Sequence, residues 1–74
     1  MDERACILLV EDNVMDVELT LDAFREAKLA NRVNVAPNGA EALDYIFGNG
    51  KYADRRAYPK PNLVLLDLKL PGID

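Results

Sequence analysis

The chain has no histidine and only one cysteine among its 74 residues. The absence of histidine excludes histidine-based metal sites from this chain, and it also excludes Ser-His-Asp and Cys-His catalysis within it. A single cysteine excludes an internal disulfide bond. Cys6 lies inside an apolar run, where a free cysteine packs as a small buried hydrophobe. These features fit a reducing compartment, and we expect the protein to be cytoplasmic.

Long apolar runs and basic stripes are also missing. Asp2 and Glu3 precede only a short apolar run, so we predict neither a signal peptide nor a membrane span. Lysines and arginines form no stripe, and the formal net charge is −4. We therefore expect no nucleic-acid partner for this segment. Arg55 and Arg56 form a single pair in a polar stretch, where we expect them to be solvated.

Two short aliphatic runs stand out, residues 5–10 and residues 63–66. An unbroken apolar run of this length is typical of a strand buried on both faces, as in a parallel sheet. Acidic residues follow both runs: Glu11 and Asp12 come after the first, and Asp67 comes after the second. A chain of this length has room for one small globular domain of modest stability.

Helical patterns fill the segments between these strands. Asn13 is a favourable N-cap for a first helix that should fray by residues 29–31, and Asn38 or Gly39 begins a second helix that ends at residues 48–50. We predict that the first helix presents Val14, Val17, Leu21 and Phe24 on one face, and the second Ala40, Leu43, Ile46 and Phe47. The polar stretch 51–61 should be a long loop anchored by its two tyrosines, Tyr52 and Tyr58.

The order of elements is strand, helix, strand, helix, strand, which predicts an α/β fold with a parallel sheet and right-handed crossovers. Residues 32–36 alternate polar and apolar side chains, so the second strand belongs at a sheet edge. This favours the strand order 2-1-3, in which the first and third strands are neighbours. Ligands of open parallel sheets bind outside the carboxyl ends of the strands, where Asp12 and Asp67 would then meet.

Three carboxylates at one edge, from Glu11, Asp12 and Asp67, would repel each other unless a cation joined them. A hard divalent cation with oxygen ligands, above all Mg²⁺, relieves this repulsion. Asp67 would then be the nucleophile toward a phosphoryl group, since carboxylates form aspartyl-phosphates. The alternative is a set of strand-end acids that face water and hold no metal.

Residues 7–13 together with residues 65–72 resemble the receiver domain of two-component response regulators, and residues 38–43 resemble that family's entry into its second helix. The resemblance implies a flavodoxin-like, doubly wound parallel sheet, of which residues 1–74 form the N-terminal β-α-β-α-β part. Residues 16–21 and the loop 48–61 look most like stand-alone receivers paired with phytochrome-type histidine kinases.

The resemblance also implies roles. Asp67 would accept a phosphoryl group from a sensor histidine kinase, Asp12 would bind Mg²⁺ directly, and Glu11 would help through water. The backbone carbonyl of Lys69 would supply a further ligand. Such a protein takes part in its own phosphorylation without being a turnover enzyme. The Lys69 side chain departs from the family pattern, and it could reach the phosphoryl group and alter its lifetime or stay in solvent.

The resemblance also implies two further strands and three helices, with a Ser/Thr and a Lys that touch the phosphoryl group, which these 74 residues do not include. We expect the third strand to have an exposed edge that invites pairing. The missing half would belong to a longer protein, a partner chain or a second copy in a homo-oligomer.

Three other interpretations compete with the receiver. A haloacid-dehalogenase-like enzyme needs a second Asp two positions after the nucleophile, where Lys69 stands. A flavodoxin-like flavin binder needs a Ser/Thr/Gly-rich phosphate loop where Glu11 and Asp12 lie. An inactive half-receiver would serve only as an assembly or dimerisation module.

Overall fold

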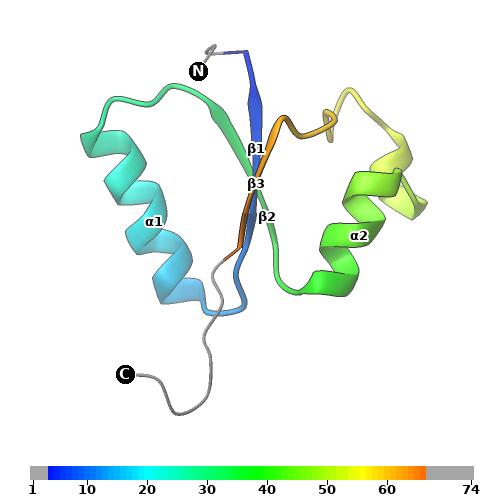
Figure 1. The fold of residues 1–74 in the computed structure, drawn as a ribbon, viewed down its shortest axis with the longest axis horizontal. Helices are drawn as coiled ribbons and strands as arrows, with labels where there is room; N and C mark the ends of the chain where they lie inside the picture. Colours follow the sequence, from blue (N-terminus) through cyan, green and yellow to red (C-terminus); the bar gives the residue numbers. More distant parts are fainter. Residues whose placement is uncertain (1–3, 67–74) are drawn as a thin grey trace.

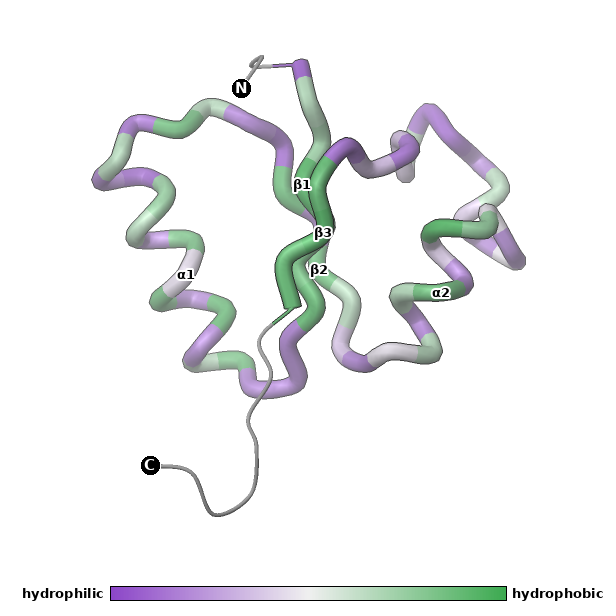
Figure 2. Tube along the Cα trace, viewed as in Figure 1, coloured by the Kyte–Doolittle hydropathy of each residue, from purple (hydrophilic) through white to green (hydrophobic). Residues whose placement is uncertain are grey.

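The structure, a computed structural model, describes residues 4–66. Three strands, β1 (Cys6–Val10), β2 (Arg32–Ala36) and β3 (Leu63–Leu66), form a parallel sheet in the order β2-β1-β3 (Figure 1). The predicted α/β class and strand order are therefore confirmed. Figure 2 shows the apolar residues concentrated on the three strands at the centre. None of the helices in this part of the chain has the length and apolar character of a membrane span.

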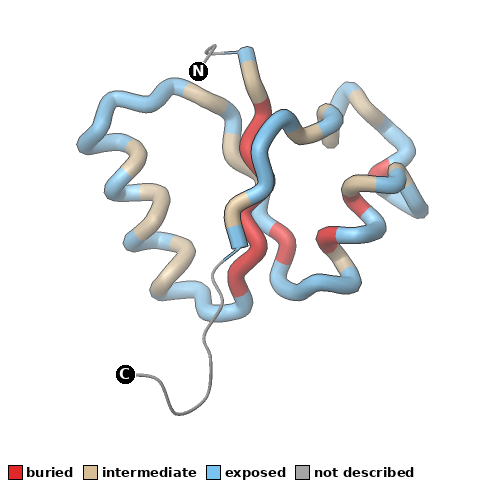
Figure 3. The backbone as a smooth tube through the Cα atoms, viewed as in Figure 1, coloured by how far each residue is buried: buried red, intermediate tan, exposed pale blue. Residues whose placement is uncertain are grey.

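The central strand β1 forms the middle of the core. All five of its residues are buried (Figure 3), because β2 and β3 flank it and a helix lies over each of its faces. The prediction of burial on both faces is correct for β1 and wrong for residues 63–66. At the β3 edge Leu63 is 40% exposed and Leu66 60% exposed, since β1 is their only described neighbour in the sheet. The expected exposed edge is thus present.

Helix α1 (Val14–Glu26) and helix α2 (Gly39–Phe47) lie on opposite sides of the sheet (Figure 1). Both begin at the predicted asparagine. The side chain of Asn38 accepts a hydrogen bond from the Glu41 backbone N–H at 2.8 Å. Helix α2 is capped at its C-terminus by Gly48, whose φ of 70° is the left-handed conformation that favours glycine. The capping residues read from the sequence therefore fix the helix boundaries.

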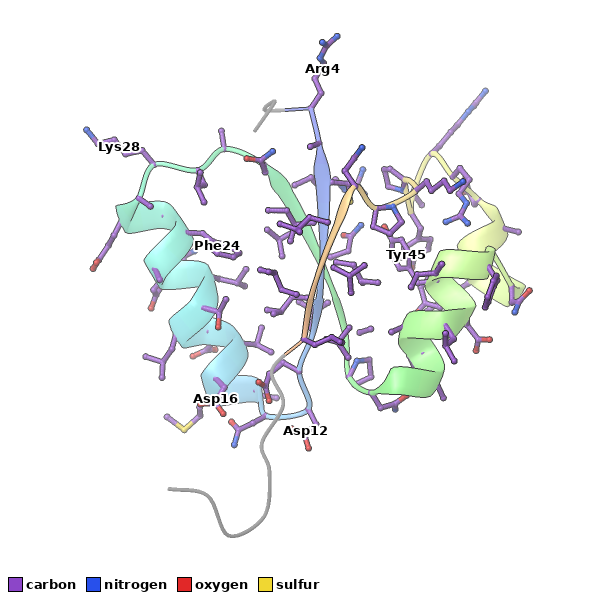
Figure 4. All side chains as sticks on the ribbon, viewed as in Figure 1. Arg4, Asp12, Asp16, Phe24, Lys28 and Tyr45 are labelled. Carbon is purple, nitrogen blue, oxygen red and sulfur yellow. The ribbon has the colours of Figure 1, made fainter. Side chains whose placement is uncertain are left out.

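The sheet-facing side of α1 is only partly buried. Val17, Leu21 and Phe24 are half-buried, and Phe24 points toward the strands (Figure 4). The predicted face is wrong at Val14, which is 72% exposed because it is the first residue of the helix. No residue of α1 is buried, so this helix contributes less to the core than α2.

The predicted inner face of α2 is confirmed at Ile46 and wrong at Ala40, Leu43 and Phe47. Ala42 and Tyr45 are buried and Ile46 is half-buried, whereas Leu43 is 55% exposed and Phe47 71% exposed; the predicted Ala40 is exposed as well. Apolar side chains lie on both sides of this helix, so their spacing alone could not identify the buried side. Tyr45 takes the inner position because its hydroxyl finds polar partners there.

Three aromatic rings join α2 to the loop that follows it. The centroid of the Tyr45 ring is 5.0 Å from that of Tyr52 and 5.9 Å from that of Tyr58, and the Tyr52 and Tyr58 centroids are 4.9 Å apart. Tyr52 belongs to a short 3₁₀ helix, η1 (Gly50–Ala53), and is buried. The prediction that the loop tyrosines anchor this loop is confirmed.

The hydroxyl of Tyr45 connects the sheet to the loop. It donates a hydrogen bond to the Pro59 carbonyl at 2.8 Å and accepts one from Asn34 Nδ2 at 2.7 Å. The buried Cys6 sulfur lies 3.8 Å from it, which confirms the packing role expected of this cysteine. Burial raises the pKa of the Tyr45 hydroxyl above its usual value. It therefore stays protonated and able to donate.

The prediction that Arg55 is solvated is wrong, although Arg56 is exposed as expected. The guanidinium of Arg55 donates to the carbonyl of Tyr45 at 2.9 Å and to that of Ile46 at 3.0 Å. These carbonyls lie at the C-terminal end of α2, where a cation is favourable. A Cβ at Gly48 would lie 2.8 Å from Arg55 Nη2, so the glycine also leaves room for this contact.

Alkaline pH is expected to weaken the attachment of the loop. The Tyr52 hydroxyl donates to Glu41 Oε2 at 2.5 Å, and this bond to a carboxylate raises the Tyr52 pKa to about 12. The folded pKa exceeds the unfolded value of about 10, so this contribution to stability is fully present below pH 10 and is lost as pH rises through about 12. Urea unfolding across this pH range measures how far the free energy of unfolding falls. It should fall less for Tyr52→Phe than for the wild-type chain, and an identical fall in both proteins would contradict the assignment.

Candidate functional site

The carboxyl ends of β1 and β3 lie side by side. The two strands are parallel, and their register runs from Ile7↔Leu63 to Val10↔Leu66. Glu11 is the next residue of the chain after Val10, and Asp67 is the next after Leu66. Asp67 and Lys69 lie outside the described residues. The register pairs Val10 with Leu66, the last residues before the acids of each strand. It therefore supports the predicted closeness of these acids as far as the described residues reach.

Glu11 is buried at 5% exposure. Its backbone N–H donates to the Ala36 carbonyl at 3.0 Å, and its Oε1 accepts a hydrogen bond from the Asn13 backbone N–H, also at 3.0 Å. A buried carboxylate is costly unless it is hydrogen-bonded. The structure thus places the Glu11 carboxylate in a held position at the end of β1.

Asp12 is exposed at the same end of the sheet, beside the first turn of α1 (Figure 4). Asp16 belongs to that turn. The predicted Glu11–Asp12 pair is therefore at the carboxyl edge, with one side chain buried and the other open to solvent. That this pair lies close to Asp67 stays a prediction.

The chemistry of the two carboxylates fits Mg²⁺. Both supply hard oxygen donors, the ligand type that Mg²⁺ prefers, and Mg²⁺ is typically held by one or two carboxylates with water completing its shell. Between residues 4 and 66, no three acidic, cysteine or histidine side chains gather closely enough to hold a metal ion. Further protein ligands would have to come from Asp67 and Lys69, beyond the described residues.

Sequence reasoning identified Asn13 only as a helix cap. In the structure its side-chain Oδ1 accepts from the backbone N–H groups of Met15 at 2.9 Å and Asp16 at 3.2 Å, while its own N–H binds Glu11. The signal available in the sequence was the acid two residues before the cap. That spacing allows a side-chain carboxylate to accept from the capping residue's backbone.

No family model matches the chain. Response regulator Rcp1 of Synechocystis sp. strain PCC 6803 is 34% identical to it over 68 residues, which are 92% of this chain and 44% of Rcp1. The solved structure of the bacteriophytochrome response regulator AtBRR is 53% identical, with a TM-score of 0.77 over 99% of this chain and 51% of that one. The chain matches part of a response-regulator receiver domain.

The crystal structure of response regulator RPA3017, described as acting in red light signaling of R. palustris, is similar to this chain with a TM-score of 0.84. It is 34% identical and is matched over 95% of this chain and 49% of its own length. The chain therefore spans about half the length of the relatives it matches.

Proposed function

We propose that this chain is the phosphoacceptor part of a two-component signalling receiver. The observation that carries the proposal is the β1–β3 register, which ends at Val10↔Leu66, one residue before Glu11 in the first strand and one before Asp67 in the second. A parallel pair that ends level brings the residues that follow it to one edge of the sheet. The match to response regulators supports the same assignment.

In the proposed reaction, an Asp67 carboxylate oxygen attacks the phosphorus of a phosphohistidine. The bond from phosphorus to the histidine nitrogen breaks, and an aspartyl-phosphate forms. Asp12 and Asp67 would hold Mg²⁺, Glu11 would help through water, and the Lys69 carbonyl would supply a further ligand. When bound, Mg²⁺ neutralises charge on the transferred group. The chain contributes the nucleophile and the metal ligands and is not a turnover enzyme.

The proposed donor is a sensor histidine kinase of the phytochrome type. The support is the set of similar structures, which includes the bacteriophytochrome response regulators AtBRR and RtBRR at 53% and 46% identity. A transient kinase encounter needs only a small interface.

Intact mass after incubation with Mg²⁺ and acetyl phosphate tests the chemistry. We expect one phosphoryl adduct on the wild-type chain. Asp67→Asn should give no adduct because the nucleophile is missing, and the wild-type chain without Mg²⁺ should give none because the charge on the transferred group is not neutralised. Asp22→Asn is the matched control, since it removes an exposed acid of α1 that is ion-paired with Arg25, and it should leave the adduct intact. An adduct that survives Asp67→Asn would refute the assignment.

The exposed β3 edge favours a second candidate, an assembly module that pairs with another copy or a complementing chain. Leu63, Val64 and Leu66 are 40%, 37% and 60% exposed, and an exposed aliphatic edge strand is a template for pairing. A folded chain that forms no adduct but sediments as a concentration-dependent oligomer would support this candidate over the receiver.

A further inference from the structure

We propose that Asn13 is a positioning residue for the Glu11–Asp12 pair, an inference that rests on the proposed function. Asn13 makes hydrogen bonds in both directions along the chain. Its backbone N–H donates to Glu11 Oε1 at 3.0 Å, and its side-chain Oδ1 accepts from the N–H groups of Met15 and Asp16. One residue thus links the buried carboxylate to the first turn of α1.

Asp12 lies between two residues whose backbones are held. Before it, the Glu11 N–H donates to the Ala36 carbonyl at the end of β2, at 3.0 Å. After it, the Asn13 carbonyl accepts from the Val17 N–H of α1, also at 3.0 Å. Because the Asp12 side chain is exposed, the position of its carboxylate depends chiefly on the backbone that carries it. The loop between β1 and α1 is therefore fixed at both ends around this residue.

This arrangement matters for Mg²⁺ because the ion demands near-ideal octahedral geometry. Groups that orient metal ligands are nearly as important as the ligands, and their loss typically weakens metal binding by about 10- to 100-fold. Without the Asn13 side chain, the N–H groups of Met15 and Asp16 lose their acceptor and the first turn of α1 loosens. The backbone N–H that holds Glu11 then loosens with it.

The chain supplies a matched control for the loss of a helix cap. Asn38 caps α2 through one hydrogen bond from the Glu41 N–H and makes no link to the acidic pair in any described contact. Asn13→Ala and Asn38→Ala therefore remove the same side chain from equivalent positions of two helices. Asn13→Ser restores a neutral side-chain acceptor at the first cap, since serine is also a preferred N-cap residue.

Isothermal titration with Mg²⁺ alone measures the effect on the wild-type chain and the three variants. We expect Asn13→Ala to bind Mg²⁺ about tenfold more weakly, and Asn13→Ser and Asn38→Ala to stay within about twofold of wild type. Thermal unfolding without Mg²⁺ should show comparable losses of stability for the two alanine variants. A general loss of stability would lower Mg²⁺ affinity in both, whereas a positioning role lowers it only in Asn13→Ala.

Equal Mg²⁺ affinities for Asn13→Ala and Asn38→Ala would overturn the positioning role and leave the proposed function intact. A wild-type chain that binds no Mg²⁺ would instead overturn the metal site itself, and the positioning role with it. If Asn13→Ala does not fold, Asn13→Gly gives the same comparison, because glycine is tolerated at an N-cap and has no side-chain acceptor.

Discussion

Replacing Leu8 with alanine is expected to unfold much of the chain at 25 °C. Leu8 is fully buried in the middle of β1 and belongs to the core cluster that includes Ala42, Tyr45 and Tyr52. A buried leucine-to-alanine change costs about 2–5 kcal/mol, because apolar contact is lost and a cavity remains. At the lower end of typical stability per residue, a chain of this size has only about 4 kcal/mol in total.

Far-ultraviolet circular dichroism during urea unfolding would measure the effect of Leu8→Ala. Leu19→Ala is the matched control, since Leu19 is 65% exposed on α1 and exposed substitutions of this kind usually change stability by less than about 0.5 kcal/mol. Similar unfolding midpoints for the two variants would show that β1 is not the centre of the core.

Replacing Tyr45 with alanine should destabilise the fold by about 3–5 kcal/mol, the range for deleting a large buried aromatic side chain. The ring contacts both other tyrosines, and the hydroxyl joins Asn34 to Pro59. Tyr45→Phe separates these two contributions. It keeps the ring and leaves the half-buried polar partners of the hydroxyl unsatisfied, for a loss of about 1–3 kcal/mol.

Denaturant unfolding of both Tyr45 variants beside Phe47→Ala tests this expectation. Phe47 lies two residues further along α2 and is 71% exposed, so its removal deletes an aromatic ring from the same helix without opening the core. If Phe47→Ala were as destabilising as Tyr45→Ala, the side of α2 that carries Phe47 would be the one that packs against the core.

The elements with a single apolar pattern could be predicted from the sequence. The aliphatic run of β1 and the alternation of β2 placed one strand inside the sheet and the other at an edge. Asn13 and Asn38 marked where the helices begin, because few side chains can accept from the first free backbone N–H groups. Local chemistry alone decides these features.

Features that depend on distant parts of the chain could not be read in this way. Helix α2 carries apolar residues on both sides, so the choice of Tyr45 over Phe47 as the buried aromatic required the rings of Tyr52 and Tyr58. The role of Arg55 at the end of α2 also depends on how the loop returns. At the candidate site, the sequence placed Glu11 and Asp12 correctly at the end of β1 but did not indicate that Glu11 is buried.

The tyrosine cluster gives this chain an intrinsic fluorescence signal that reports on only one part of the fold. All three tyrosines of the chain belong to it, and there is no tryptophan. Intrinsic fluorescence therefore reports on the packing of α2 against its loop, and it does not report on α1, which lies on the other side of the sheet, or on the acidic pair at the carboxyl end of β1. A fluorescence transition and a far-ultraviolet transition that do not coincide would reveal that these two sides unfold separately.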